Sequence, residues 1–432
     1  MKLKRALTMI MATTLSVSML AACSSKPEEA ASTEPTTPAV EKQPAKDVKL
    51  SFMTNVVGVQ ADSLKKAVDD FAAKTGYTVE FSAPGKSYEE LMKTKMSSNT
   101  MPDLFTTHGW SVARYSEYLE PVNDMAFASR ISDQMKSVIS DKNGKMYVLP
   151  IDADIAGMIY NEDVLKAAGV NVDDIKTWTD FEAAAAKIKG TGKEVVSIGG
   201  KDVWTIGQFF DWVAPSFYVT NDSNNKREEL KSGKFDTATW EQVAGLMDKW
   251  TKAGYFNKDV LTADYNGDMA ALANGEAAFS FYGNSSIVDA KKLNPNAKLG
   301  MMPIPAADAS DTPTLIAGER VAVGVWKDSK NKAEAIELLN YLATPEVAVT
   351  ISDATGNPSG LKGVKGNLGD IQQFYDKYAS VRTLPYFDRE YLPSGMWDVM
   401  CATGADILAG KGNSVKNAAK VMEQNFNDKY VK

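Results

Sequence analysis

Histidine and cysteine, which most often bind transition metals, are almost absent from this sequence of 432 residues. It contains one histidine, His108, and two cysteines, Cys23 and Cys401. A structural zinc site takes four ligands that are mostly Cys or His, so we expect no metal. Cys401 lies in an apolar stretch, where a free cysteine behaves as a small hydrophobic residue. The sequence also has no P-loop motif, so we expect no nucleotide and no cofactor.

An excess of positive charge is lacking as well. Lys and Arg number 48 against 55 Asp and Glu, which gives a net charge of -7 at pH 7. Without a basic patch, we expect no binding to nucleic acid and no electrostatic attraction to anionic lipid. The apolar run at residues 6–19 is shorter than the ~20 residues that a membrane-spanning helix needs. That run therefore predicts no transmembrane helix.

The N-terminus instead has the layout of a secretory signal peptide. Three basic residues (Lys2, Lys4 and Arg5) precede the apolar run, and small residues lead up to Cys23. The sequence Leu-Ala-Ala-Cys at 20–23 resembles the lipobox of bacterial lipoproteins. That resemblance implies cleavage before Cys23 and lipid attachment to its sulfur, whereas the alternative is an ordinary secreted protein with an incidental cysteine. Lipidation would leave Cys401 alone, so we expect no intramolecular disulfide.

Removal of the signal peptide at 1–22 takes away three positive charges and leaves a formal net charge of -10. Residues 24–47 contain no aromatic residue and few large apolar ones, so 23–47 is predicted to be a disordered tether that carries the lipid anchor. The folded part begins at residue 48. Its length exceeds the size at which a single hydrophobic core stops growing, and we expect two domains.

Short strands and helices alternate from residue 48 onward. A strand there is followed by a helix at 60–74, a strand at 77–81, a helix at 88–96 and a strand at 104–107. Later strands are predicted at 157–160, 277–282, 298–302 and 321–326, and later helices at 178–189, 237–253, 331–350, 394–410 and 414–430. This alternation predicts an α/β fold with mostly parallel sheets flanked by helices.

Several motifs occur in an order that resembles a known family. They are Pro-Asp-Leu-Phe at 102–105, Gly-Lys-Met-Tyr-Val-Leu-Pro at 144–150, Ile-Tyr-Asn at 159–161, Thr-Trp-Thr-Asp-Phe at 177–181 and Asn-Gly-Glu-Ala-Ala-Phe at 274–279. Together with Pro-Ile-Pro at 303–305 and Ala-Thr-Pro-Glu at 343–346, they resemble the extracytoplasmic solute-binding proteins of bacterial ABC importers, in the branch that includes maltose-binding protein. Each motif alone is weak, but their order across the mature chain is specific.

The resemblance implies a two-lobed, periplasmic-binding-protein-like fold with a ligand cleft between the lobes. Lobe 1 would comprise 48–155 plus 304–350, and lobe 2 would comprise 156–303 plus 351–432. The chain would cross between them near 155–160, 303–305 and 350–356. Such lobes close around a ligand through a few hinge residues.

Four candidate ligand residues belong to lobe 1. Trp110 follows the strand at 104–107, at the edge where open α/β sheets bind ligands, and an aromatic ring can pack on the apolar face of a sugar. His108 lies beside it. Asp152 and Asp154 share one face of an extended segment, and Asp154 matches an acidic position that faces the cleft in the resembled family. The alternatives are packing for Trp110, a structural role for His108 and hinge support for Asp152.

Lobe 2 supplies five candidates, and the second segment of lobe 1, 304–350, supplies one more. Asp211 and Trp212 lie where the family presents a carboxylate and an aromatic ring, although their segment also reads as a buried helix. Tyr282 and Asn284 stand where the family has Gly-x-Trp, and the missing Trp argues against a maltodextrin ligand. Further candidates are Trp397, for which core packing is the alternative, and Arg320. Arg320 could bind an acidic sugar or form a surface salt bridge.

The resemblance implies an extracytoplasmic binding lipoprotein that captures a carbohydrate and delivers it to an ABC permease. We expect a monomer attached to the outer face of the cell membrane through Cys23. The alternatives are a secreted glycoside hydrolase using Asp152 and Asp154, a protein for a non-sugar solute such as a polyamine, and an adhesion lipoprotein. No catalytic motif accompanies the two carboxylates, so we expect no enzyme activity.

Overall fold

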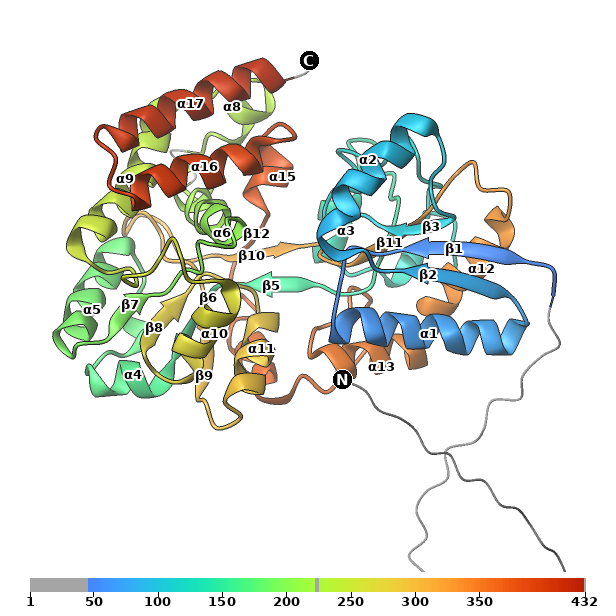
Figure 1. Cartoon of the computed structure of the whole chain (residues 1–432), viewed down its shortest axis with the longest axis horizontal. Helices are drawn as coiled ribbons and strands as arrows, with labels where there is room; N and C mark the ends of the chain where they lie inside the picture. The colour runs from blue at the N-terminus through green and yellow to red at the C-terminus, as the bar shows by residue number, and fades with distance from the viewer. Residues whose placement is uncertain (1–45, 222–224, 431–432) are drawn as a thin grey trace, which may run out of the picture. The chain divides into compact units, whose positions relative to one another are not determined.

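Two hydrophobic cores divide the chain into two lobes in the computed structural model, which describes residues 46–221 and 225–430 (Figure 1). The core of lobe 1 is built from residues between Leu50 and Leu361, and it omits the stretch that forms lobe 2. The signal peptide at 1–22, Cys23 and the tether up to residue 45 lie outside the described residues.

Lobe 1 is a five-stranded sheet in the order β2-β1-β3-β11-β4. Its strands are β1 (Lys49–Met53), β2 (Thr78–Ser82), β3 (Leu104–Thr106), β4 (Leu149–Pro150) and β11 (Ala322–Val325). Its helices are α1 (Val59–Thr75), α2 (Tyr88–Ser98), α3 (Asp133–Ile139), α12 (Lys332–Leu342) and α13 (Pro345–Thr355). In Figure 1, α1 and α13 lie below this sheet, and α2 lies above it. The apolar residues of α1 recur at helical spacing, so they form one face that is buried on the sheet.

Lobe 2 contains a four-stranded sheet in the order β7-β8-β6-β9. Its strands are β6 (Met158–Asn161), β7 (Glu194–Val196), β8 (Ala277–Ser280) and β9 (Leu299–Met302). Its helices are α4 (Glu162–Ala167), α5 (Trp178–Gly190), α6 (Trp204–Val213), α7 (Pro215–Tyr218), α8 (Arg227–Lys231), α9 (Thr237–Ala253), α10 (Tyr265–Ala273), α11 (Ser285–Leu293), α14 (Gln372–Lys377), α15 (Phe387–Tyr391), α16 (Met396–Leu408) and α17 (Ser414–Lys429). A capping box between Thr177 and Asp180 starts α5 where the sequence predicts it.

Three strands form a separate small sheet that joins the lobes. They are β5 (Asp154–Ala156), β10 (Leu315–Gly318) and β12 (Thr383–Pro385), in the order β12-β10-β5. Figure 1 shows β5 and β10 running side by side from one lobe to the other. Their antiparallel pairing fixes which residues of the two crossing segments face each other.

The α/β fold with two lobes is confirmed, but both sheets are mixed rather than mostly parallel. In lobe 1, β1 pairs in parallel with β2 and β3, whereas β11 runs antiparallel to β3 and β4. In lobe 2, β6 is antiparallel to β8 and β9. The reason is connectivity. β11 follows the crossing strand β10 and therefore enters lobe 1 from the side of lobe 2, so it runs opposite to its neighbours β3 and β4.

The two cores shift the second and third crossings from their predicted places. Ile304, Leu315 and Ile316 pack in the core of lobe 2, so the second crossing is β10 and not 303–305. Ile351 and Leu361 pack in lobe 1, which moves the third crossing beyond 350–356. The lobe to which each residue belongs is decided by the core in which its side chain is buried, and the sequence motifs do not predict that burial.

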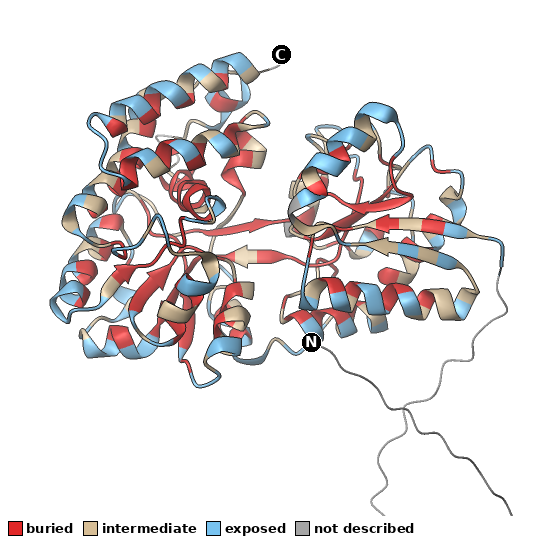
Figure 2. Cartoon of the chain, in the orientation of Figure 1, coloured by how far each residue is buried: buried red, intermediate tan, exposed pale blue. Residues whose placement is uncertain are grey.

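One predicted helix is two. The stretch 331–350 is interrupted between α12 and α13, because Pro345 occupies the first turn of α13 and cannot continue the preceding helix. Figure 2 shows the strands of lobe 2 and the strands β3, β4 and β11 of lobe 1 largely buried, β2 at the edge of its sheet intermediate or exposed, and the outer faces of the helices exposed. Within residues 46–221 and 225–430, no helix is both long and apolar enough to cross a membrane.

Candidate functional site

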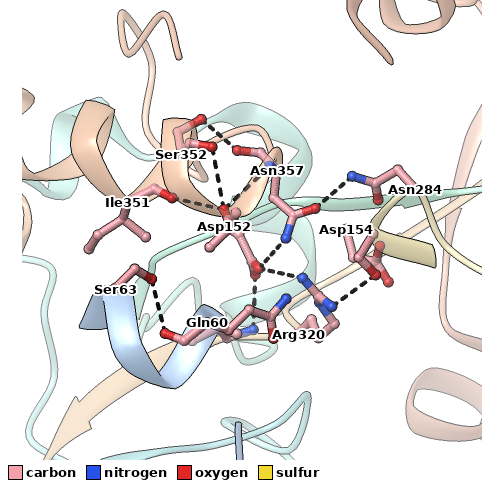
Figure 3. Close-up of polar contacts among 12 residues, drawn as sticks. Gln60, Ser63, Asp152, Asp154, Asn284, Arg320, Ile351, Ser352 and Asn357 are labelled. Atoms are coloured by element: carbon pink, nitrogen blue, oxygen red, sulfur yellow. Dashed lines mark hydrogen bonds and ion pairs between the residues drawn. The ribbon is translucent and has the colours of Figure 1, made fainter. Parts of the chain in front are cut away.

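Arg320, partly buried, and Asp152, buried, form an ion pair where the crossing segments leave lobe 1 (Figure 3). Nη2 of Arg320 lies 3.0 Å from Oδ2 of Asp152, and Oδ1 of Asp152 accepts a hydrogen bond from the N–H of Val321. Nη1 of Arg320 donates to the hydroxyl of Ser285, on α11 of lobe 2, at 3.0 Å. Burial raises the pKa of Asp152, and the charge of Arg320 opposes that rise. Asp152 and Arg320 are therefore partners of each other.

Asp154 and Asn284 extend this polar network toward lobe 2. Oδ2 of Asp154 accepts a hydrogen bond from the hydroxyl of Tyr386. The amide of Asn284 donates to the Oδ1 of Asn357 at 2.8 Å (Figure 3). A Cβ on Gly283 would lie 2.6 Å from Oδ1 of Asp154, so the close approach of these segments requires glycine there. The predicted residues Asp152, Asp154, Asn284 and Arg320 thus come together.

Arg389 joins the lobes at a second place, next to Trp110. It belongs to α15 of lobe 2, yet its Cζ lies 5.8 Å from the ring centroid of Trp110 in lobe 1. A Cβ on Gly109, whose φ is +82°, would lie 2.2 Å from Nη1 of Arg389. The guanidinium also packs over the ring of Tyr386 at 4.5 Å. Trp110 itself is only 8% exposed, and Arg114 covers its ring at 4.4 Å.

Three buried carboxyl groups surround this guanidinium. Glu319, fully buried, accepts hydrogen bonds from the N–H of Ser111 at 2.9 Å and the hydroxyl of Thr107 at 3.3 Å. Burial raises the pKa of Glu319 to about 7. Asp211 accepts the N–H of Asp388 at 2.7 Å, and burial together with the charge of Asp388 raises the pKa of Asp211 well above its usual range.

Buried polar atoms without a hydrogen-bond partner gather around the same place. Among the described residues they include Oγ of Ser111, Oε2 of Glu319, Oδ1 of Asp388 and Nε of Arg389. Buried polar groups in native proteins are nearly always paired, so each such atom calls for an explanation. Four of them around one interlobe contact indicate a surface suited to a polar ligand.

A cavity of about 220 Å³ opens beside Arg389. It lies between lobe 1 and the segment around α15, and its lining residues are Gly109, Val112, Ala113, Val138, Ser140, Pro385, Tyr386, Arg389 and Glu390. The wall combines apolar side chains with a few polar groups, as in small-molecule sites generally. Arg389 and Tyr386 therefore connect the cavity to the polar network at the crossings.

The other predicted residues lie apart from the cavity or inside a core. Trp212 is 1% exposed within the core of lobe 2, and Asp211 beside it holds the start of α15. Tyr282 is buried and donates its hydroxyl to Asp268 at 2.5 Å. Trp397 is half-buried against the core of lobe 2. His108 has a φ of 49° and places Nδ1 3.6 Å from Oε1 of Glu89.

Sequence reasoning missed Glu319, Tyr386 and Arg389. Glu319 could have been found, because it stands beside Arg320 directly after the apolar strand β10 (Leu315–Gly318), where a carboxyl group is unusual. Tyr386 and Arg389 carry no comparable signal. Their segment, Tyr-Phe-Asp-Arg-Glu, reads as an ordinary amphipathic turn of helix.

Comparison with known proteins gives consistent matches along the chain. Residues 58–349 match the sequence profile of the bacterial extracellular solute-binding proteins. The melibiose/raffinose/stachyose-binding protein MelE of Bacillus subtilis (strain 168) is 32% identical over 380 residues, which are 86% of this chain and 88% of MelE.

Solved structures agree with these sequence matches. A sugar transporter of Bacillus licheniformis in complex with stachyose is 32% identical, with a TM-score of 0.80 over 89% of this chain and 100% of that one. A binding protein of Bacillus subtilis in an open conformation is 29% identical, with a TM-score of 0.82 over 91% of this chain and 98% of that one. The family profile spans more than half of the chain, and the chain therefore belongs to the bacterial extracellular solute-binding protein family.

Proposed function

We propose that this chain is the substrate-binding lipoprotein of an ABC importer and that it captures a neutral oligosaccharide between its two lobes. The similarity to MelE, whose name specifies melibiose, raffinose and stachyose, carries this proposal because it covers 86% of the chain. The stachyose complex of the similar transporter from Bacillus licheniformis supports the same ligand class.

The chemistry at the lobe boundary supports a sugar. A sugar offers hydroxyl groups that both donate and accept hydrogen bonds, and the site offers both kinds of partner. Glu319 and Asp388 present buried carboxyl oxygens without partners, and Arg389 presents N–H groups. A ligand bound by both lobes favours the conformation in which the lobes meet, to the extent that it binds that conformation better.

The charges of the site support a neutral ligand rather than an acidic one. Arg320, the cation that could have received a uronate, is held by Asp152 at 3.0 Å. Burial lowers the pKa of Arg389, and the nearby carboxyl groups of Asp388, Asp211 and Glu319 each raise it. Neither Arg320 nor Arg389 is thus left without a nearby carboxyl group to meet an anionic sugar.

The remaining parts of the proposal concern where the protein acts. Lipid on Cys23 would hold a monomer at the outer face of the cell membrane, and two acyl chains anchor stably where one does not. A tether at 23–47 would let the folded part reach the permease. Energy for transport would come from ATP hydrolysis in separate subunits, and no nucleic acid takes part.

Isothermal titration calorimetry tests the ligand class. The chain from residue 24 onward, which lacks the lipidation site, is titrated with melibiose, raffinose and stachyose. Maltotriose, digalacturonate and spermidine serve as comparisons. We expect micromolar or tighter binding of at least one of the first three and no binding of spermidine. Binding of none of the three sugars would contradict the proposal.

Thin-layer chromatography of the sugar recovered after prolonged incubation tests the alternative of a glycoside hydrolase. The expected result is intact sugar, because Asp152 is occupied by Arg320 and Asp154 by the hydroxyl of Tyr386. Release of a monosaccharide would show that the chain is an enzyme.

A further inference from the structure

We propose that Arg389 determines which sugar is bound, by donating hydrogen bonds to the hydroxyl groups of one neutral sugar ring in the cavity beside it. This inference rests on the proposed function and names the residue and the part of the ligand involved. Four features of the site support it: the unmet donors of Arg389, the charge around it, the size of the cavity, and the way the side chain is held.

The first step is that the guanidinium has no hydrogen-bond acceptor among the described residues. An arginine carries five N–H donors. The side chain of Arg389 is 18% exposed, its Nε is buried without a partner, and the nearest carboxylate oxygen to Nε, on Asp388, is 3.8 Å away. A buried charged donor without an acceptor has lost its hydration with no hydrogen bond in return, so an acceptor from a ligand would be favoured.

The second step concerns the kind of acceptor. Asp388 and Asp211 lie beside Arg389, and Glu319 faces it from lobe 1. Asp388 is the ion-pair partner of Arg389, 3.8 Å from its Nε, although no hydrogen bond joins them. An anionic ligand would place a second negative charge beside that pair and beside two further carboxyl groups, whereas the oxygen of a hydroxyl group accepts hydrogen bonds without adding a charge. The planar fork of arginine suits two adjacent hydroxyl groups of one ring.

The third step is that one ring fits. An apolar cavity of ~150 Å³ accommodates benzene, so the cavity of about 220 Å³ is large enough for one six-membered ring with its hydroxyl groups. Val112, Val138 and Pro385 offer apolar surface for the C–H face of the ring, and Ser140 offers a hydroxyl group.

The fourth step is that the chain holds Arg389 in one position. Asp211 accepts the N–H of Asp388 at 2.7 Å and so fixes the first turn of α15. Tyr386 stacks under the guanidinium, and Gly109 leaves the space that the guanidinium fills, since a Cβ there would lie 2.2 Å from Nη1. Asp211 is thus a positioning residue for Arg389, and Gly109 is required for its contact with lobe 1.

The variant Arg389→Lys tests the proposal, because lysine keeps the charge but loses the planar fork. Binding of the tightest of melibiose, raffinose and stachyose is measured by calorimetry on the chain from residue 24 onward. We expect at least a tenfold loss of affinity. Arg114→Lys is the matched control: Arg114 covers the same Trp110 ring but is paired with Glu89, and its affinity should stay within twofold of the wild type.

A set of monodeoxy analogues of the same sugar separates ligand contact from a structural role. For the hydroxyl group that Arg389 binds, removal should weaken binding to the wild type about tenfold and should leave binding to Arg389→Lys unchanged. Gly109→Ala displaces the guanidinium by a different route and should reproduce the loss if Arg389→Lys fails to fold.

The outcomes are distinguishable. If the wild type binds none of the three sugars, the proposed function fails and this inference fails with it. If the wild type binds one of them but Arg389→Lys binds it within twofold, the function stands and the role of Arg389 is wrong. If every deoxy analogue loses the same affinity in both proteins, Arg389 shapes the fold and does not contact the ligand.

Discussion

The carboxylate of Asp152 and the guanidinium of Arg320 lie 3.0 Å apart, as a pair that joins two of the chain segments passing between the lobes. The register of the crossing strands explains the pair. Asp154 lies opposite Gly318 in the antiparallel ladder of β5 and β10, and two further residues along each strand place Asp152 opposite Arg320. The ion pair is therefore a product of strand register and not of sequence proximity.

Removing one partner should destabilise the protein strongly. Asp152→Ala leaves the partly buried charge of Arg320 without this carboxylate. Breaking a fully buried pair costs ~3–5 kcal/mol, and we expect a loss near the lower end of that range. Urea unfolding followed by circular dichroism measures the change. Asp69→Ala, which breaks the exposed pair with Lys65, is the control and should cost less than ~1 kcal/mol. Equal losses from the two variants would show that the Asp152 pair contributes no more than a surface contact.

Glu319 should make the folded state less stable as the pH rises. Its pKa is about 7 in the folded chain, above the ordinary value of 4.5, so the unfolded chain loses its proton first. The free energy of unfolding then falls as the pH rises from about 4.5 to about 7. Between pH 5 and pH 8 the loss from this group is roughly 2–3 kcal/mol.

Glu319→Gln removes this titration and keeps an oxygen for the N–H of Ser111. Its free energy of unfolding should fall less than that of the wild type between pH 5 and pH 8. Asp268, whose pKa burial raises to about 6, titrates in both proteins and cancels in the comparison. Parallel pH profiles for the two proteins would mean that Glu319 is already ionised in the folded chain.

Cys401 should be unreactive until the protein unfolds. Burial raises its pKa to about 12, so the thiolate that reacts with disulfide reagents is scarce at pH 8. In the chain from residue 24 onward it is the only cysteine. Ellman's reagent should therefore detect no thiol in native buffer and one thiol in urea concentrated enough to unfold the protein. Rapid labelling of the native protein would contradict the burial of this side chain.

Trp110→Ala should weaken both stability and sugar binding. The ring is 8% exposed and packs in the core of lobe 1, so its truncation costs ~3–5 kcal/mol of stability. It also removes the surface on which Arg389 rests. Trp110→Phe retains part of that surface and should retain more of both properties. Calorimetry with raffinose and thermal unfolding measure the two effects, and unchanged stability of Trp110→Ala would contradict the packing described above.

The fold could be predicted from the sequence to a large extent. The alternation of strands and helices from residue 48, the caps of α5 and the order of the motifs were sufficient for a two-lobed α/β fold. Local backbone preferences and apolar periodicity act over short stretches, so they are legible in a linear sequence. Strand direction is not local, and for that reason the mixed sheets were not predicted.

The candidate site could be predicted only in part. Asp152, Asp154, Asn284 and Arg320 were chosen from the sequence and lie in one network, whereas Trp212 and Tyr282 have their polar groups inside lobe 2. A buried tryptophan and a ligand-binding tryptophan have the same neighbours in sequence. Only packing distinguishes them, because exposure depends on every element around the residue.

The sequence by itself determined the signal peptide pattern, the lipid-attachment motif at Cys23, the α/β class and the family to which the chain's motifs point. The tertiary structure decided that Arg320 is paired with Asp152, and that Arg389 of lobe 2 rests on Gly109 and Trp110 of lobe 1. The physical reason is the range of the interactions. Periodicity and capping are set by neighbours a few residues apart, whereas contacts between crossing strands and between lobes are set by the register and packing of distant segments.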